Sequence, residues 1–303
     1  MAEIAGVSTG EVRKPVRRGR LVPYVLLLPG MLWLVVFFVA PMITLFSQSL
    51  QEGTVEEGYT FTGNVGIYVD ALQAYWPHLL RSIGYAATAT VITLLLGYPL
   101  AYFIAQKAGR WKNIVLVLVI APFFTSFLIR TLAWRTILSD TGPVTGFAQA
   151  TGLTSLLQAV GLTATDTLLA SKFAVIAGLT YNFLPFMILP LYASLERLDP
   201  RLVEAASDLY ASPWESFRRV TWPLSLPGVV AGTLLTFIPA AGDFINSRLL
   251  GNTQTVMIGQ VIDSQFLRVL DYPLAAALSF ILLILIVTLV ALYVRRAGTE
   301  ELV

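Results

Sequence analysis

Long runs of apolar residues, separated by short polar segments, occupy the chain from residue 22 onward. A helix needs about 20 apolar residues to cross the hydrocarbon core of a bilayer. Six stretches reach this length, so the pattern predicts an all-α, polytopic membrane protein with six transmembrane helices. The predicted spans cover residues 22–48, 80–106, 113–138, 172–196, 226–247 and 274–294.

The apolar pattern contains no linker that would separate two domains, so residues 19–303 are expected to form a single transmembrane domain. Residues 1–18 are polar and basic, and we expect them to be a disordered cytoplasmic tail. A basic segment before an apolar run is also typical of a signal peptide. This run is too long and lacks a small-residue cleavage pattern, which favours an uncleaved first span.

Loops rich in lysine and arginine alternate along the chain with loops that lack both residues. The loops after the second and fourth spans are basic, whereas Gln51–His78 and Asp140–Ser171 contain neither residue. Because basic loops stay on the cytoplasmic side, the bias predicts a multi-pass protein of the plasma or inner membrane with both termini in the cytoplasm. It also places residues 198–224, between spans four and five, in the cytoplasm. Apolar residues at helical spacing in Asp140–Ser171 predict one or two short surface helices there.

Composition limits the chemistry of the chain. Hydrophobic residues make up 56% and charged residues only 13%, against about 25% charged in soluble domains. With no cysteine and one histidine, His78, we expect no metal site, no cofactor and no catalytic residue, so a membrane-embedded enzyme is disfavoured. No GxxxxGK[ST] phosphate loop occurs, and a net charge of +2 is too small to suggest nucleic acid as a partner.

The polar segment VEAASDLYASPWESFRRVTWPL, residues 203–224, has features of two short helices. Its first part places apolar residues on one side of a helix. Ser212 and Pro213 fit the start of a second helix, with serine as the cap and proline in the first turn. Glu215 stands three residues after Ser212 and completes a capping-box pattern. The segment therefore predicts a helical elbow, and a loop helix lying in the headgroup plane is the alternative.

This elbow resembles the EAA loop of permease subunits in ATP-driven importers that use a substrate-binding protein. The matching positions are Glu204, Ala205, Ala206, Val220 (in place of isoleucine) and Pro223. Two positions depart from the motif, because Tyr210 replaces its glycine and Trp222 its leucine. A tyrosine in the left-handed conformation costs about 1–2 kcal/mol. Either the elbow bends differently here, or the surface of the partner accepts a ring.

In that family the loop is a coupling helix that docks on the ATPase subunit and carries its closing motion to the spans. The resemblance assigns this role to Glu204, Ala205, Ala206, Asp208, Leu209, Tyr210, Ala211, Ser212, Phe217 and Pro223. It also implies an ABC importer type I permease fold within the lipid bilayer. The implied partners are a second, homologous permease, two cytoplasmic ATPases that bind ATP and Mg, and an external substrate-binding protein.

Residues 123–138, 181–199 and 237–252 resemble the spermidine/putrescine permeases, and most closely the first of the two permease subunits in that system. The resemblance implies a small cationic solute, a polyamine. Permeases for opines and phosphonates look similar, so another small solute remains an alternative. An ion-coupled secondary transporter would carry carboxylates or histidines in several spans, whereas only Asp243 lies well inside one.

Ionisable residues are rare inside the predicted spans, where they cost about 2.5–3.5 kcal/mol at the centre. Arg130 lies in the third span, and Asp243 follows Pro239 at a predicted break in the fifth. Either Asp243 attracts an ammonium group in the translocation path, or it forms a salt bridge with Arg130. Aromatic faces bind ammonium groups for about 0.5–2 kcal/mol each, although packing is the alternative role of such rings. The candidate path residues are Asp243, Arg130, Trp134, Tyr181, Asn182 and Phe127.

Overall fold

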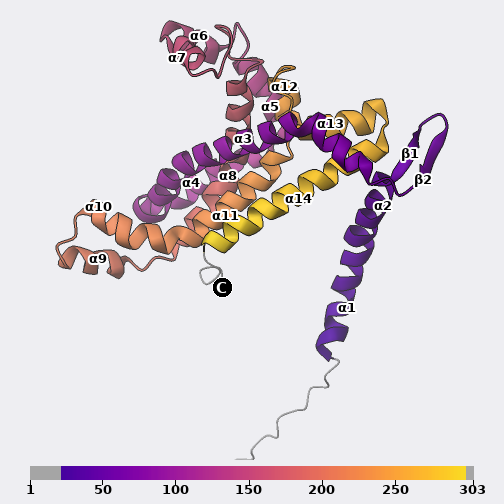
Figure 1. The fold of residues 1–303 in the computed structure, drawn as a ribbon. Coiled ribbons are helices and arrows are strands. Elements are labelled where there is room, and N and C mark those ends of the chain that lie inside the picture. The colour runs from indigo at the N-terminus through magenta and orange to yellow at the C-terminus, as the bar shows by residue number, and fades with distance from the viewer. Residues whose placement is uncertain (1–21, 298–303) are drawn as a thin grey trace, which may run out of the picture. The chain divides into compact units, whose positions relative to one another are not determined.

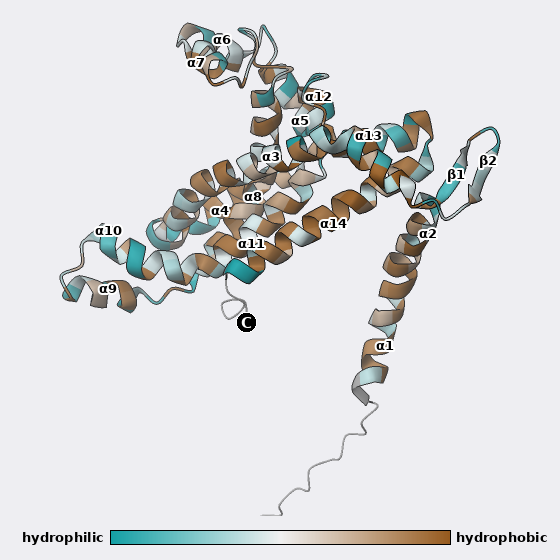
Figure 2. Cartoon of the chain, in the orientation of Figure 1, coloured by the Kyte–Doolittle hydropathy of each residue, from teal (hydrophilic) through white to brown (hydrophobic). Residues whose placement is uncertain are grey.

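The computed structural model describes residues 22–297, so the predicted tail, 1–18, lies outside the described residues. The chain divides after Ser47 into two compact units. The first unit contains α1 (Val22–Leu34), a π-helical turn (Val35–Val39) and most of α2 (Ala40–Ser49). These segments form one helix from Tyr24 to Ser49 that is long and apolar enough to cross a membrane, which confirms the first predicted span. Figure 2 shows its hydrophobic colouring.

The second unit begins with an antiparallel hairpin and continues as helices (Figure 1). The hairpin strands are β1 (Gln51–Thr54) and β2 (Gly58–Phe61). The helices are α3 (Gly66–Tyr102), α4 (Lys112–Ile120), α5 (Phe127–Ile137), α6 (Pro143–Ala150), α7 (Leu153–Ala159), α8 (Lys172–Glu196), α9 (Pro200–Asp208), α10 (Pro213–Ser216), α11 (Trp222–Ala241), α12 (Ile245–Leu250), α13 (Ile258–Ser264) and α14 (Tyr272–Ala297). Shorter 3₁₀ or π turns cover Phe103–Lys107, Gly109–Trp111, Ala121–Phe124, Phe217–Thr221 and Gln265–Val269.

The second span starts earlier than the hydropathy predicts. Helix α3 begins at Gly66 rather than near residue 80, so residues 66–78 of the expected loop Gln51–His78 are helical. Its first turns bury Ala71 and Leu79 against α13 and α14, whereas Leu72 and Trp76 on other faces are exposed. Tertiary packing therefore stabilises a helix in a stretch that is too polar to be predicted as part of a membrane span.

The third predicted span, 113–138, is not one continuous helix. Helices α4 and α5 are bent by 95° at a break between Phe124 and Phe127. Pro122 starts a short 3₁₀ turn, and Thr125 and Ser126 then take extended backbone angles. The predicted third span is therefore a broken one, because the extended backbone of Thr125 and Ser126 interrupts the helical hydrogen bonds.

The remaining spans follow the prediction more closely. Helix α8 coincides with the predicted fourth span, and α14 extends the sixth by a few residues at each end. The fifth differs, since the helix runs from Pro213 to Ala241 and a break at Gly242 separates it from α12. Asp243 therefore lies in the predicted break, not inside a continuous span. The long outer loop, where one or two short helices were expected, contains the two helices α6 and α7.

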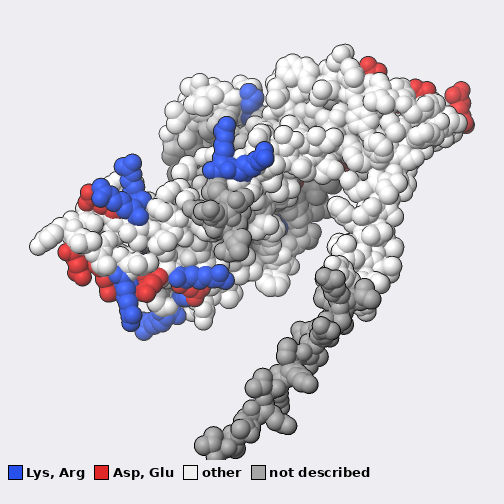
Figure 3. All heavy atoms as spheres, turned by 60° about the horizontal axis from the view of Figure 1, so that its bottom comes forward, with Lys and Arg blue, Asp and Glu red and all other residues white. Residues whose placement is uncertain are grey.

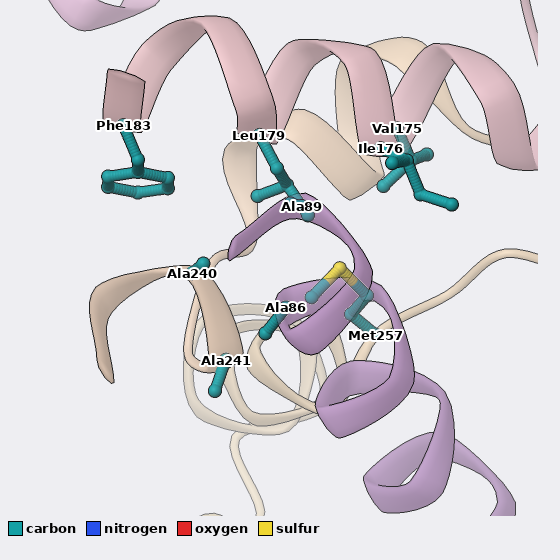
Figure 4. Close-up of a cluster of buried hydrophobic side chains, with 9 residues drawn as sticks. All are labelled: Ala86, Ala89, Val175, Ile176, Leu179, Phe183, Ala240, Ala241 and Met257. Atoms are coloured by element: carbon teal, nitrogen blue, oxygen red, sulfur yellow. The ribbon is translucent and has the colours of Figure 1, made fainter. Parts of the chain in front are cut away.

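Helices α3, α8 and α11 make the central packing of the second unit. Figure 4 shows one buried cluster in which Ala86 and Ala89 of α3 and Ala240 and Ala241 of α11 lie near Leu179 of α8. These small side chains let the helix backbones approach closely. On the face drawn in Figure 3, charged side chains of both signs gather at the end that carries α9 and α10, and much of the remaining surface is uncharged.

Candidate functional site

Helix α9 forms the first arm of the elbow and lies with α10 at one end of the bundle (Figure 1). Asp199 caps its start, because the Asp199 carboxylate accepts a hydrogen bond from the backbone N–H of Arg201 at 3.0 Å. Pro200 occupies the first helical position, where its missing N–H and fixed φ are tolerated. Two local signals, the Asp199 cap and Pro200, therefore fix the start of the elbow.

The arm ends in a Schellman motif centred on Tyr210. The N–H of Ala211 donates to the Ala206 carbonyl at 3.0 Å, and the N–H of Tyr210 donates to the Ser207 carbonyl at 3.0 Å. Tyr210 has a φ of +63°, the left-handed conformation that the family motif gives to glycine. The elbow therefore keeps the backbone of the motif with a tyrosine, at a cost of about 1–2 kcal/mol.

The second arm begins with the predicted capping box, which the structure confirms. Ser212 Oγ accepts from the backbone N–H of Glu215 at 3.3 Å, and the backbone N–H of Ser212 donates to Glu215 Oε2 at 2.9 Å. The hydroxyl of Ser212 also donates to Glu215 Oε2 at 2.9 Å, and these two donations from Ser212 hold the pKa of the Glu215 carboxyl below its usual value, because they stabilise the carboxylate. The second arm then continues through the π turn Phe217–Thr221 into α11.

An aromatic cluster fastens the elbow to the bundle. The Tyr98 hydroxyl on α3 forms a 2.8 Å hydrogen bond with Ser225 Oγ on α11, and both side chains are buried. The ring of Tyr98 lies 5.8 Å from that of Phe217 and 5.2 Å from that of Trp222, measured between centroids. Phe217 therefore packs inward. Tyr98 is not predictable as part of this site, because nothing in its local sequence links it to an elbow more than 100 residues away.

The outer surface of the elbow is apolar as well as charged. Leu209 is 81% exposed, Tyr210 98% and Trp214 67%. Of the predicted coupling residues, the exposed ones are Glu204, Ala205, Asp208, Leu209, Tyr210, Ser212 and Pro223, and the partly buried ones are Ala206, Ala211 and Phe217. Trp214 was not among the predicted residues, although a tryptophan in a polar loop is a signal for contact with a partner.

The candidate path residues form three local groups, which are Asp243 with Asn182 through Asn246, Arg130 with Phe127, and Trp134 with Tyr181. Asp243 is buried, and its Oδ1 accepts from the backbone N–H of Asn246 at 2.8 Å in the first turn of α12. The ion pairs between described residues are Lys112–Glu196 and Arg248–Asp263. Arg130 and Asp243 form no such pair, so the salt-bridge hypothesis is wrong for this structure.

Asn182 links three helices through a buried polar network. Its Nδ2 donates to Thr131 Oγ1 of α5 at 3.2 Å and to Asn246 Oδ1 of α12 at 3.0 Å. Asn182 itself belongs to α8, so the amide joins the broken third span to the broken fifth span. Through Asn246 it is also connected to Asp243.

The predicted aromatic residues separate into two contacts. The rings of Trp134 and Tyr181 lie 5.4 Å apart and line an apolar cavity of about 430 Å³ between α3, α5, α7 and α8. The guanidinium of Arg130 lies over the ring of Phe127, with 5.7 Å between its Cζ and the ring centroid. In the structure, Arg130 therefore makes a cation–π contact with Phe127, and Trp134 makes a ring contact with Tyr181.

Helices long enough to span a membrane, broken third and fifth spans, and a capped elbow before α11 agree with the class that the family model and the relatives show, the permease subunit of an ABC importer. Residues 97–297 match the family of the binding-protein-dependent transport system inner membrane component, and the chain belongs to this family. The family resemblance and the inner-membrane location predicted from the sequence are confirmed.

Relatives extend the match over most of the chain. The spermidine/putrescine transport system permease protein PotB of Salmonella typhimurium (strain SL1344) is 38% identical over 272 residues, which cover 88% of this chain and 90% of the relative. The protein of the same name from Escherichia coli (strain K12) is 36% identical over 269 residues, covering 88% and 94%. A bacterial ABC transporter involved in the import of the acidic polysaccharide alginate has a TM-score of 0.62 at 19% identity, covers 91% of this chain and 94% of its own, and supports the fold.

Proposed function

We propose that this chain forms half of the translocation path for a polyamine, spermidine or putrescine, in an ATP-driven importer. The names of relatives that are 36–38% identical over most of the chain support this solute class. A second, homologous permease subunit supplies the other half of the path. An external binding protein delivers the solute, and the permease pair alternates between outward-facing and inward-facing states.

We also propose that the elbow couples this movement to ATP hydrolysis in two partner ATPase subunits, which bind ATP and Mg. The observation that carries this proposal is the exposed apolar surface of Leu209, Tyr210 and Trp214 on two capped helical arms. A large exposed apolar patch on a polar loop is typical of a protein interface. The aromatic contacts of Phe217 with Tyr98 give the elbow a direct connection to α3.

The orientation follows from the charge bias. The elbow and both termini lie in the cytoplasm, since Arg197, Arg201, Arg218 and Arg219 flank or belong to this loop. The hairpin β1–β2 and helices α6 and α7 then face outward, toward the binding protein. In this arrangement the chain itself carries out no catalysis.

Reconstitution tests the whole proposal. The chain is assembled in proteoliposomes with its ATPase, second permease and binding protein, and uptake of labelled spermidine, putrescine, octopine and a phosphonate is measured. We expect uptake of the two polyamines that requires both ATP and the binding protein. Uptake of octopine or the phosphonate alone would assign another solute, and uptake driven by an ion gradient without ATPases would contradict the importer mechanism.

A further inference from the structure

Four phenylalanine rings form a closed series of contacts with Arg130. Phe123 and Phe127 flank the break between α4 and α5, whereas Phe183 and Phe186 belong to α8. The centroid distances are 6.1 Å for Phe127–Phe183, 6.1 Å for Phe183–Phe186 and 5.0 Å for Phe123–Phe186. Arg130 closes the series, because its Cζ lies 5.0 Å from the centroid of Phe123 and 5.7 Å from that of Phe127. We call these four rings the phenylalanine cage.

The charge of Arg130 has little other compensation within the described chain. The side chain is 9% exposed, and its Nε has no hydrogen-bond partner among the residues described. No carboxylate of residues 22–297 lies within ion-pair distance of it. A charge inside a membrane span is costly, and cation–π contacts are strongest where the cation is desolvated. The rings of the cage therefore supply the main attraction that the described residues offer to this guanidinium.

The composition of the cage favours an organic cation as its occupant. Rings without a carboxylate attract guanidinium and alkylammonium groups, whose charge is spread or whose alkyl stem is apolar, over strongly hydrated metal ions. The cage also lies at the broken third span, and helix breaks within membranes are common along solute paths. Phe186 is 36% exposed while Phe183 is 6% exposed, so the Phe186 side of the cage is the accessible one.

We propose that the phenylalanine cage is a binding subsite for the ammonium end of an alkylamine solute, and that Arg130 is its resident cation when the solute is absent. Exchange of one cation for another leaves the charge inside the cage unchanged, so the exchange avoids burying a second charge. Because two like charges repel, the guanidinium and the ammonium cannot occupy the cage together. The inference deepens the proposed function and depends on it for the identity of the solute.

Removal of the resident cation tests the proposal without a transport assay. The assembled complex carrying Arg130→Ala is compared with wild type and with Arg135→Ala, which removes an exposed arginine of the same helix. Methylguanidinium and methylammonium are added at millimolar concentration, with sodium chloride as the ionic control, and thermal unfolding is followed. We expect an increase in Tm of about 2–4 °C for Arg130→Ala at ligand concentrations near ten times Kd. Wild type and Arg135→Ala should not respond.

A second pair of variants assigns the effect to the rings. In the Arg130→Ala background, Phe123→Leu should abolish the response to methylguanidinium, whereas Phe124→Leu should retain it, because Phe124 is 90% exposed and outside the cage. An equal response in both backgrounds, or no response of Arg130→Ala, overturns the proposal. If Arg130→Ala does not assemble, Arg130→Gln is tested in the same way. Failure of both variants to assemble even with methylguanidinium present also overturns it.

The methylguanidinium test of the cage can succeed or fail independently of the uptake test of the proposed function. The methylguanidinium response measures the cage directly, whatever solute the importer carries. A complex that imports phosphonate and yet shows the response would contradict the polyamine assignment and retain the cation cage. A complex that imports spermidine and shows no response would contradict the cage alone.

Discussion

A single residue, Tyr210, concentrates the backbone strain of the elbow. Its φ of +63° suits glycine, so Tyr210→Gly relieves about 1–2 kcal/mol, of which the greater freedom of unfolded glycine cancels about 0.5–1 kcal/mol. We expect the free energy of unfolding to rise by about 1 kcal/mol in thermal or denaturant unfolding. The ATPase rate stimulated by the binding protein should nevertheless fall, because the exposed ring is lost. A less stable variant would show that the ring, despite its exposure, stabilises the fold.

Asp243 has two separable properties, its charge and its acceptor oxygen. Asp243→Asn retains an oxygen that accepts the N–H of Asn246, whereas Asp243→Ala removes it. If the charge attracts the solute, Asp243→Asn should lower uptake at least tenfold while leaving Tm within about 2 °C of wild type. Asp243→Ala should lower both. Normal uptake by Asp243→Asn would limit this residue to capping α12.

The sequence located Arg130 and Asp243 as costly charges but did not predict their contacts. Their pairing was the simplest solution for two opposite charges inside apolar segments. In the structure each finds a local partner instead, Asp243 a backbone N–H and Arg130 a pair of rings. The contacts of Arg130 depend on the 95° bend between α4 and α5, which the hydropathy pattern does not predict.

Among the elements, the second arm of the elbow depends on its capping box. Ser212→Ala removes the acceptor for the Glu215 N–H, and replacement of an N-cap serine costs about 1 kcal/mol. We expect faster proteolysis between Asp208 and Phe217 and weaker coupling of ATP hydrolysis to uptake. Ser207→Ala is the matched control, because Ser207 is an exposed serine in the other arm. Equal effects of the two variants would contradict a specific role of the box.

Elements were predictable where local signals were unambiguous. Helix α8 begins after Ser171, whose side chain accepts from the N–H of Ala174, and ends where the apolar run ends. Proline was a poor guide to breaks, since Pro185 and Pro190 lie inside α8 without interrupting it. In the third span the extended backbone of Thr125 and Ser126 makes the break, and neither residue forbids a helix.

At the scale of the whole molecule, the cysteine-free sequence permits a direct test of orientation. Ser207→Cys in α9 and Ser155→Cys in α7 each introduce one exposed thiol. A membrane-impermeant maleimide should label Ser155→Cys in intact cells, and Ser207→Cys only in inverted vesicles. Labelling of both positions from the same side would contradict the predicted arrangement of spans.

Coupling between subunits is also a property of the whole assembly. Glu204→Lys reverses an exposed charge on α9 without removing any contact that holds the elbow together. We expect the variant to insert and fold, with uptake lost and ATP hydrolysis no longer stimulated by the binding protein. Co-purification of the ATPase and the melting temperature are measured in parallel. Normal uptake by this variant would rule out a coupling role for Glu204.

The π turn Phe217–Thr221 has a further consequence for how the elbow is aimed. A π turn holds one residue more than an α-helix of the same length, and each residue of an α-helix corresponds to a rotation of about 100°. The turn therefore sets the angular phase between α10 and α11. Two chains with identical elbow motifs, one with this extra residue and one without it, would present to a partner faces of the same helix that differ by about 100°.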